Sequence, residues 1–297
     1  MSVWWALCRR EWLEHRGGYG WAPLVVLALM LCAALTAISF GAWSGSEEQA
    51  DFSEMLEHAA AHPQATDLGL RLALRELAQP FVWVYFGVAF FVMLGTLFDE
   101  RKDRTVLFWK SLPPSDAQSV LSKLITTIWI APLATIAVIF AAKLLFLILL
   151  SFYIAGSDTL SVSGFWAAAN LPLALAEWLF GFFTQSLWSL PIWCWLLLVS
   201  AVAPRLPVLW ALLTPLVPIV MEWALFKSTV LLSGINAHLT FIALPSYREL
   251  DSGAAIQTVG FSDMLSIWTR GGFWVGIGIA LIMLAAAIYF RRRNNEL

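Results

Sequence analysis

Charged residues are scarce in this chain. Asp, Glu, Lys and Arg make up 13% of its 297 residues, whereas 60% are hydrophobic. In soluble domains about a quarter of the residues are charged, so the composition excludes an ordinary soluble domain. The mean hydropathy of +0.76, with 17 tryptophans and 20 phenylalanines, predicts an integral membrane protein with several spans.

Cysteine and histidine are also few. The three cysteines lie far apart, and we interpret them as packing residues rather than as a disulfide or zinc framework: Cys8, Cys32 and Cys194. All four histidines lie outside the apolar runs, and neither G-x-S-x-G nor H-E-x-x-H occurs, which argues against an intramembrane enzyme. His58 and His62 have the i,i+4 spacing of a metal-binding helix face. No third ligand accompanies them, so we expect no metal site and assign no catalytic residue.

Six apolar runs are long enough to cross a bilayer, which takes about 20 residues per helix. They are residues 21–43, 80–98, 124–154, 170–201, 208–226 and 272–290. Backbone groups in lipid must be paired within their own segment, so these runs should be helices. We expect a single all-α transmembrane domain over residues 1–297. The third and fourth runs exceed a simple crossing, so either they tilt, or they project beyond the bilayer, or the fourth bends at Pro172 and Pro191.

The basic residues predict the orientation. Six spans put both termini on one side, and a cytoplasmic placement of the termini gathers most lysines and arginines there, in agreement with the positive-inside rule. The cytoplasmic set is Arg9, Arg10, Arg16, Arg101, Lys102, Arg104, Lys110, Lys123, Arg205, Arg291, Arg292 and Arg293. The same lysine and arginine bias places the loop after the first span outside. This loop is acidic, and its apolar-periodic end at 68–77 predicts a helix leading into the second span.

Residues 1–18 predict a helix that lies in the membrane interface. Trp4, Trp5 and Trp12 alternate with Arg9 and Arg10. Such a helix places its tryptophans at the headgroup level and its arginines toward anionic lipid. No short apolar core with a small-residue cleavage site precedes the first span, so we expect this segment to be retained.

The stretch from 98 to 123 concentrates charge in a poorly charged chain. Glu100 and Arg104 are spaced i,i+4 with the acid first, which favours continuation of the second span as a helix into the cytoplasm. An apolar cluster at 106–109 and two adjacent prolines follow. Ser115 and Gln118 then match a capping box that begins a new helix. The pattern predicts a helix, a break and a second helix.

These residues resemble the cytoplasmic loop of ABC-2 type permeases, the membrane subunits of ABC exporters. The resemblance is carried by Phe98, Asp99, Glu100, Arg101, Thr105, Phe108, Trp109, Ser111, Leu112, Pro113, Ser115, Leu121 and Lys123. It implies that the loop seats in a groove of a separate ATPase subunit, with an aromatic anchor and a charged rim. The coupling residues so implied are Glu100, Arg101, Arg104, Phe108, Trp109, Leu112, Pro113 and Ser115.

The chain lacks the means to bind ATP through a phosphate-binding loop. No Gly-Lys pair occurs, so the motif G-x-x-x-x-G-K-[ST] is absent. The resemblance therefore implies that ATP and Mg²⁺ bind to a partner ATPase present in two copies, while this chain is not an enzyme and holds no cofactor. It also implies export across a bacterial inner membrane by a homodimer or by a pairing with a related permease. Membrane lipids are expected partners and nucleic acid is not.

Small-residue spacings and intramembrane charges are the remaining candidates. Gly272 and Gly276 have a spacing that allows close helix contacts, as have Gly41 and Gly45. Ionisable groups within apolar runs are costly and are functional hypotheses by default. The three candidates are Lys143, Glu177 and Glu222.

We favour a structural pair or an interface position for Lys143 and Glu177. Glu222 is expected to cap a helix, or to pair near the outer face with Lys227. The resemblance implies a short helix at 230–244 that dips into the membrane, and a surface loop with an interfacial helix is the equal alternative for this segment. A secondary transporter or channel, which would use an ion gradient, and a non-transporting scaffold or sensor are the alternative functions. No residue in the sequence selects a cargo.

Overall fold

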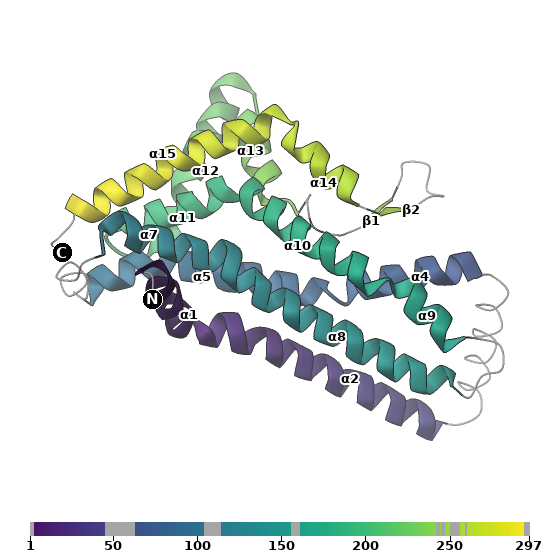
Figure 1. The fold of residues 1–297 in the computed structure, drawn as a ribbon. Helices are drawn as coiled ribbons and strands as arrows, with labels where there is room; N and C mark the ends of the chain where they lie inside the picture. Colours follow the sequence, from purple (N-terminus) through teal and green to yellow (C-terminus); the bar gives the residue numbers. More distant parts are fainter. Residues whose placement is uncertain are drawn as a thin grey trace.

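The computed structural model describes residues 3–44, 63–103, 114–155, 161–241, 244, 247–249, 256–258 and 260–293. Its helices, with the two π-helical segments labelled η, are α1 (Val3–Glu14), η1 (Gly17–Trp21), α2 (Ala22–Ser44), α4 (Pro63–Glu76), α5 (Gln79–Lys102), α7 (Asp116–Ile125), η2 (Thr126–Ile130), α8 (Ala131–Ile154), α9 (Val162–Ala169), α10 (Leu171–Trp188), α11 (Leu190–Val202), α12 (Pro207–Phe226), α13 (Val230–Leu239), α14 (Phe261–Trp268) and α15 (Gly271–Arg293). Two short strands, β1 (Tyr247–Glu249) and β2 (Ile256–Thr258), pair antiparallel. Apart from that hairpin the described chain is helical, as expected (Figure 1).

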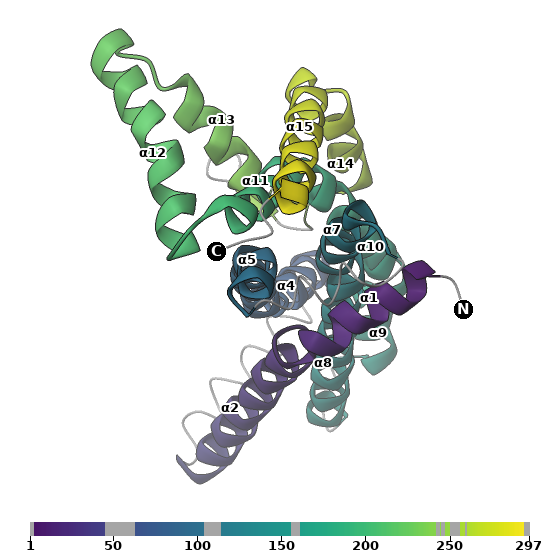
Figure 2. The ribbon, with the colours of Figure 1, turned by 90° about the vertical axis from the view of Figure 1, so that its left-hand side faces the viewer.

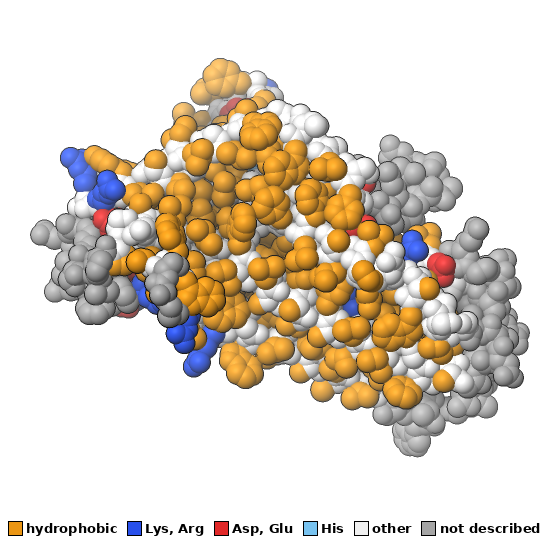
Figure 3. Space-filling model, in the orientation of Figure 1, with side chains coloured by type: hydrophobic (Ala, Val, Ile, Leu, Met, Phe, Trp, Pro, Cys, Tyr) orange, Lys and Arg blue, Asp and Glu red, His pale blue; other side chains and the backbone are white. Residues whose placement is uncertain are grey.

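Six helical stretches of the described chain are long and apolar enough to span a membrane, and they contain α2, α5, α8, α10, α12 and α15. Between 6% and 44% of each apolar window is buried inside the molecule. Most of this apolar surface therefore needs lipid around it. Figure 3 shows hydrophobic side chains across the middle of the visible face, with basic side chains gathered at the end where α1, α7 and the end of α15 lie. The prediction of a multi-span helical membrane protein is confirmed.

The fourth expected span consists of two helices rather than one. α10 ends at Trp188 and α11 begins at Leu190, with Ser189 between them. Pro191 sits at the start of α11 and Pro172 at the start of α10, where the ring is tolerated because the first helical N–H groups have no intrahelical acceptor. The helix is thus interrupted beside both prolines, at Ser189 before Pro191 and at Asn170, in the left-handed conformation, before Pro172.

Short helices from the segment after α12 pack back onto this junction. Ser189 Oγ donates to the carbonyl of His238 at 3.0 Å, and Trp188 Nε1 donates to the carbonyl of Ala237 at 2.7 Å. A Cβ on Gly276 of α15 would lie 2.6 Å from His238 Cε1, so a larger residue there would collide with α13. Gly276 therefore serves a close contact within the chain.

Glu222 caps the helix that follows it. Its carboxylate accepts hydrogen bonds from the backbone N–H groups of Val230 and Leu231, both at 2.9 Å, and from Ser228 Oγ at 2.7 Å. A carboxylate at a helix N-terminus satisfies unpaired donors and favours the helix dipole. Lys227 lies instead over the ring of Trp223, 4.6 Å from its centroid. Of the two expectations for Glu222, the cap is confirmed; α12 and α13 form a hairpin that leans away from the other helices (Figure 2).

Helices α5, α11 and α15 form the centre of the molecule, and α11 packs against both of the others. The buried cluster includes Ala89 and Met93 of α5, Leu197 of α11 and Ala280 of α15, and all four are fully buried. Small residues at these crossings let the backbones approach closely. The ends of α5 and α15 are thereby fixed relative to each other, which positions the polar site described next.

The first two helices join the bundle through paired π-helical turns. Tyr19 of η1 shares a hydrogen bond of 2.9 Å with Thr127 Oγ1 of η2, and Tyr85 donates to the Thr127 carbonyl at 2.8 Å. A Cβ on Gly18 would lie 2.5 Å from Val88 Cγ1, so the chain passes close to α5 at this point. These contacts hold the junction of α1 and α2 against the junction of α7 and α8.

Candidate functional site

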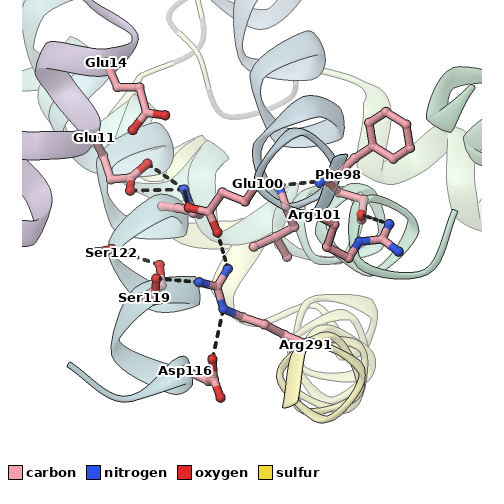
Figure 4. A network of polar contacts seen from close by, with 12 residues as sticks. Glu11, Glu14, Phe98, Glu100, Arg101, Asp116, Ser119, Ser122 and Arg291 are labelled. Carbon is pink, nitrogen blue, oxygen red and sulfur yellow. Dashed lines mark hydrogen bonds and ion pairs between the residues drawn. The ribbon is translucent and has the colours of Figure 1, made fainter. Parts of the chain in front are cut away.

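Glu100, near the C-terminal end of α5, is the centre of a buried ionic network (Figure 4). Its Oε1 lies 3.0 Å from Lys123 Nζ and 3.4 Å from Arg10 Nη2. Its Oε2 accepts from Arg291 Nη1 at 2.6 Å. The Glu100 side chain is 5% exposed, so its charge depends on these partners rather than on water. One carboxylate thus connects α1, α5, α7 and α15.

Lys123 of α7 is shared between two acids. Besides Glu100, its ammonium donates to both carboxylate oxygens of Glu11 in α1, at 3.1 and 3.0 Å. The Lys123 and Glu11 side chains are each 2% exposed. Because an ammonium has three donors, this geometry uses all of them on protein oxygens.

Arg291, in the last turn of α15, completes the network on the opposite side. Its Nε donates to Asp116 Oδ1 at 3.2 Å and its Nη2 to Ser119 Oγ at 3.1 Å. Together with the bond to Glu100, the guanidinium spans α5 and α7 with its fixed fork of donors. The apolar helix α15 is therefore attached, through Arg291 at its C-terminal end, to the first turn of α7.

The network is nearly balanced in charge. Three cations face three acids, namely Arg10, Lys123 and Arg291 against Glu11, Glu100 and Asp116. Glu14, 45% exposed, adds a further contact of 3.3 Å to Arg10. Removal of one member of such a buried pair costs about 3–5 kcal/mol because a desolvated charge is left behind. The arrangement is therefore rigid while it is intact.

His15 borders the network and is not protonated easily. Burial lowers the pKa of its imidazole, an effect that outweighs the opposing influence of Glu11 and Glu14. Lys123 and Arg10 lower the pKa further. Its Nε2 is buried without a hydrogen-bond partner among the residues that the structure describes. The neutral ring fits this position better than the imidazolium does.

Arg101 ties the same end of α5 to α11. Its Nη2 donates to the carbonyls of Ser200 and Ala203, both at 2.9 Å. In return, Ser200 Oγ accepts from the backbone N–H groups of Leu97 and Phe98 at 3.0 Å. The contact satisfies carbonyls at the C-terminal end of α11 that lack an intrahelical donor.

The structure describes the helices that precede and follow the expected coupling loop, α5 and α7. α5 continues to Lys102, and Ser115 with Gln118 forms the predicted capping box: Gln118 N–H donates to Ser115 Oγ at 3.2 Å and Ser115 N–H to Gln118 Oε1 at 2.9 Å. These two predictions are confirmed. The other expected coupling residues lie outside the described residues: Arg104, Phe108, Trp109, Leu112 and Pro113.

Glu100 and Arg101 do not lie on an exposed polar rim. They are 5% and 9% exposed and bind other helices of the same chain. The sequence pattern showed their charge but not the folding of α1, α11 and α15 around them. They lie instead in the packed end of α5, against α1, α7, α11 and α15.

Sequence reasoning missed the partners of Glu100. Arg291 counted only as a topology signal, Lys123 only as a topology signal and as part of the resemblance, and Glu11 and Asp116 carried no assignment. The signal that could have pointed to these residues was the scarcity of charge in the chain. Each of them stands next to an apolar run, where a charge needs a partner. The spacing of 112 residues between Glu11 and Lys123 hides their contact from any local pattern.

Lys143 of α8 and Glu177 of α10 line one cavity, away from the ionic network. Glu177 Oε2 is 3.4 Å from Nη2 of Arg75 in α4, and no ion pair joins Glu177 to Lys143 in the described chain. The predicted helix leading into α5 exists as α4, and it supplies the partner of Glu177. Glu177 therefore stands in a structural pair, with Arg75.

Among the described residues, no group of three or more His, Cys, Asp or Glu side chains has the arrangement of a metal site. His58 and His62 lie outside that part of the chain.

Fold and polar site together define a multi-span helical membrane protein whose chain ends meet in a buried ionic network. No family model, curated protein or solved structure matches this chain.

Proposed function

We propose that this chain is the membrane-spanning permease subunit of an ATP-driven ABC transporter, working as an exporter. The observation that carries the proposal is that the two helices flanking segment 104–113, α5 and α7, are joined to each other by a buried ion pair. Glu100 precedes this segment and Lys123 follows it, and the two side chains meet at 3.0 Å within the network that also holds α1 and α15. The sequence of the segment itself resembles the coupling loop of ABC-2 type permeases.

The physical reason is mechanical. A force on segment 104–113 acts on α5 and α7, whose ends are joined to each other and to α1 and α15 by buried ion pairs. Separation of those pairs would cost about 3–5 kcal/mol for each uncovered charge. A displacement of the loop therefore carries the attached helices with it, which is what transmission of ATPase motion into the membrane requires.

The partners follow from this role. A separate ATPase, present in two copies, supplies ATP and Mg²⁺, while Phe108 and Trp109 supply the aromatic anchor that enters its groove. Two permease chains, identical or related, complete the transporter. The chain resides in a bacterial inner membrane with both termini in the cytoplasm, because the basic end of the molecule then faces inward.

Capture of the ATPase tests the proposal. The tagged chain is purified from its native membrane, and the co-purifying ATPase activity is measured for wild type and for the double variant Phe108→Asp with Trp109→Asp. We expect the double variant to lose the ATPase by at least tenfold, since burial of two aromatic anchors is replaced by burial of charge.

Leu206→Asp is the matched control. Leu206 is 65% exposed in the turn between α11 and α12, at the same end of the molecule, and its left-handed backbone accepts Asp. This variant should retain the ATPase. Equal ATPase recovery from all three proteins would contradict the proposal.

A further inference from the structure

A cavity of about 230 Å³ lies at the end of the bundle away from the ionic network. Its walls come from α4, α8, α10 and the end of α9, which Figure 1 places together at the side opposite α1 and α7. Arg71, Arg75, Lys143 and Glu177 supply its charged groups. With three cations and one carboxylate, it carries a net charge of +2 when all are ionised.

Lys143 is the unusual member of this set. The residue is 1% exposed, and its ammonium forms no hydrogen bond or ion pair with any residue that the structure describes. Its neighbours are ring faces, Phe140 at 4.9 Å and Trp178 at 5.1 Å from Nζ to the centroid. Cation–π contact compensates only part of the cost of desolvating an ammonium. An anion in the cavity would supply the missing acceptors.

Two arginines line the same cavity as Lys143. Arg71 Nε donates to the carbonyl of Ala168 at 3.0 Å, which fixes the guanidinium at the C-terminal end of α9. Arg75 is held by Glu177 at 3.4 Å, a long contact for a charge-assisted bond. Arginine forks together with an ammonium suit the several oxygens of a phosphate.

The N-terminus of α10 adds to this field. Asn170 joins α9 to α10 in the left-handed conformation, with φ of 38°, and α10 has 18 residues. Leu171, in the first turn of α10, also lines the cavity. The positive end of a helix dipole favours a bound anion.

Apolar side chains share the walls with the charges. Leu74 and Trp178 are buried, whereas Leu68 and Leu173 are 37% and 46% exposed at the outer surface. A ligand with a phosphate head and an apolar tail would meet both kinds of surface.

We infer that this cavity is a binding site for a phosphate-type anion, held by Lys143, Arg71 and Arg75. The same chemistry is offered by the head of an anionic phospholipid and by a water-soluble phosphate. The inference does not rest on the proposed ATP-driven function, because it uses only the cavity, its charges and an ammonium without a hydrogen-bond or ion-pair partner among the described residues.

Binding measurements on the purified full-length chain test the inference. One arm titrates dioleoylphosphatidylglycerol and, as a zwitterionic comparison, dioleoylphosphatidylcholine into the detergent-solubilised protein by native mass spectrometry. The other arm titrates inorganic phosphate and follows the melting temperature. The variants are Lys143→Met, which keeps an apolar stem without the charge, and Arg71→Gln, on an exposed residue whose replacement leaves the core intact.

We expect each variant to bind the anion about ten- to a hundredfold more weakly, the range for loss of one charge-assisted hydrogen bond. Lys227→Met is the matched control, because Lys227 also lies on a tryptophan ring but lines no part of this cavity. It should bind as wild type does. Arg71→Gln decides the test if Lys143→Met does not fold.

Preference for phosphatidylglycerol over phosphatidylcholine identifies a lipid head as the occupant. Binding of inorganic phosphate without lipid preference identifies a soluble anion, and either result supports the site. Absence of binding in both arms, or equal affinity in wild type, Lys143→Met and Arg71→Gln, would overturn it.

Discussion

Arg291 and Glu100 are 191 residues apart in the chain, and their side chains meet at 2.6 Å. Both are 5% exposed. The contact joins the end of the last helix to the base of segment 104–113, and Lys123 with Glu11 extends it to the first helix. The first and last helices, α1 and α15, are therefore linked through Glu100 and Lys123, which stand on either side of segment 104–113. This is the segment for which we propose an ATPase contact.

Replacement of the central carboxylate should destabilise the protein strongly. Glu100→Gln leaves Lys123 and Arg291 buried with less negative charge nearby, which costs about 3–5 kcal/mol. The melting temperature of the purified chain, followed by tryptophan fluorescence, should fall by several degrees. Glu14→Gln is the control: Glu14 is 45% exposed, so its loss should change stability by no more than about 0.5 kcal/mol. Equal melting of Glu100→Gln and wild type would show that the network contributes nothing to stability.

The capping box should determine how firmly α7 begins. Ser115→Ala removes the acceptor for the Gln118 N–H and should cost about 1 kcal/mol. Ser115→Gly should cost only a few tenths, because glycine leaves the backbone donors open to water. Hydrogen exchange at 116–119 is the measurement, with faster exchange expected in Ser115→Ala. Unchanged protection in that variant would be incompatible with a stabilising cap.

His15 should make the stability depend on pH. Burial lowers the pKa of His15 in the folded protein below its ordinary value of 6.5, so the unfolded chain binds the proton more readily. The stability contributed by the neutral ring is present above pH 6.5 and is lost as the pH falls from 6.5 through the lower folded pKa. Wild type should therefore lose more melting temperature than His15→Asn between pH 7.5 and pH 5.

The comparison with His15→Asn separates the histidine from the carboxylates around it. Glu11 and Glu14 face His15 and raise its pKa, while Lys123 and Arg10 lower it. These four groups are present in both proteins. Parallel pH profiles of wild type and His15→Asn would contradict the assignment.

Local sequence patterns predicted the helices well. Runs of apolar residues marked the long helices, and Ser115 with Gln118 marked the start of α7, because hydropathy and capping depend on neighbouring residues. Glu222 was recognised as a possible cap for the same reason. The backbone N–H groups that donate to its carboxylate lie only 8 and 9 residues further along the chain.

The partners of buried charges could not be predicted in this way. Arg75 and Glu177 are 102 residues apart, and the sequence offered Lys143 as an equally suitable partner for Glu177. Which cation meets the acid depends on how α4 folds against α9 and α10. Glu100 and Arg101 were placed on the surface for a similar reason, since only the packing of α15 and α11 covers them.

The central claim is that motion of segment 104–113 reaches α1 through the ion pairs of Glu100 and Lys123, and a distance measurement tests it most directly. Spin labels are placed at Trp5→Cys on α1 and Leu206→Cys after α11, both exposed, at 57% and 65%. The native cysteines are replaced by alanine. The distance between the labels is measured by pulsed electron resonance in the complex with the captured ATPase, with and without a non-hydrolysable ATP analogue.

We predict a shift of the distance on addition of the analogue. The shift should be smaller in Glu100→Gln while the ATPase stays bound, measured below the melting temperature of the variant, because among the ion pairs of the described residues only that of Lys123 with Glu11 then links α7 to α1. An unchanged distance in the wild-type complex, or the same shift in Glu100→Gln, would contradict the claim.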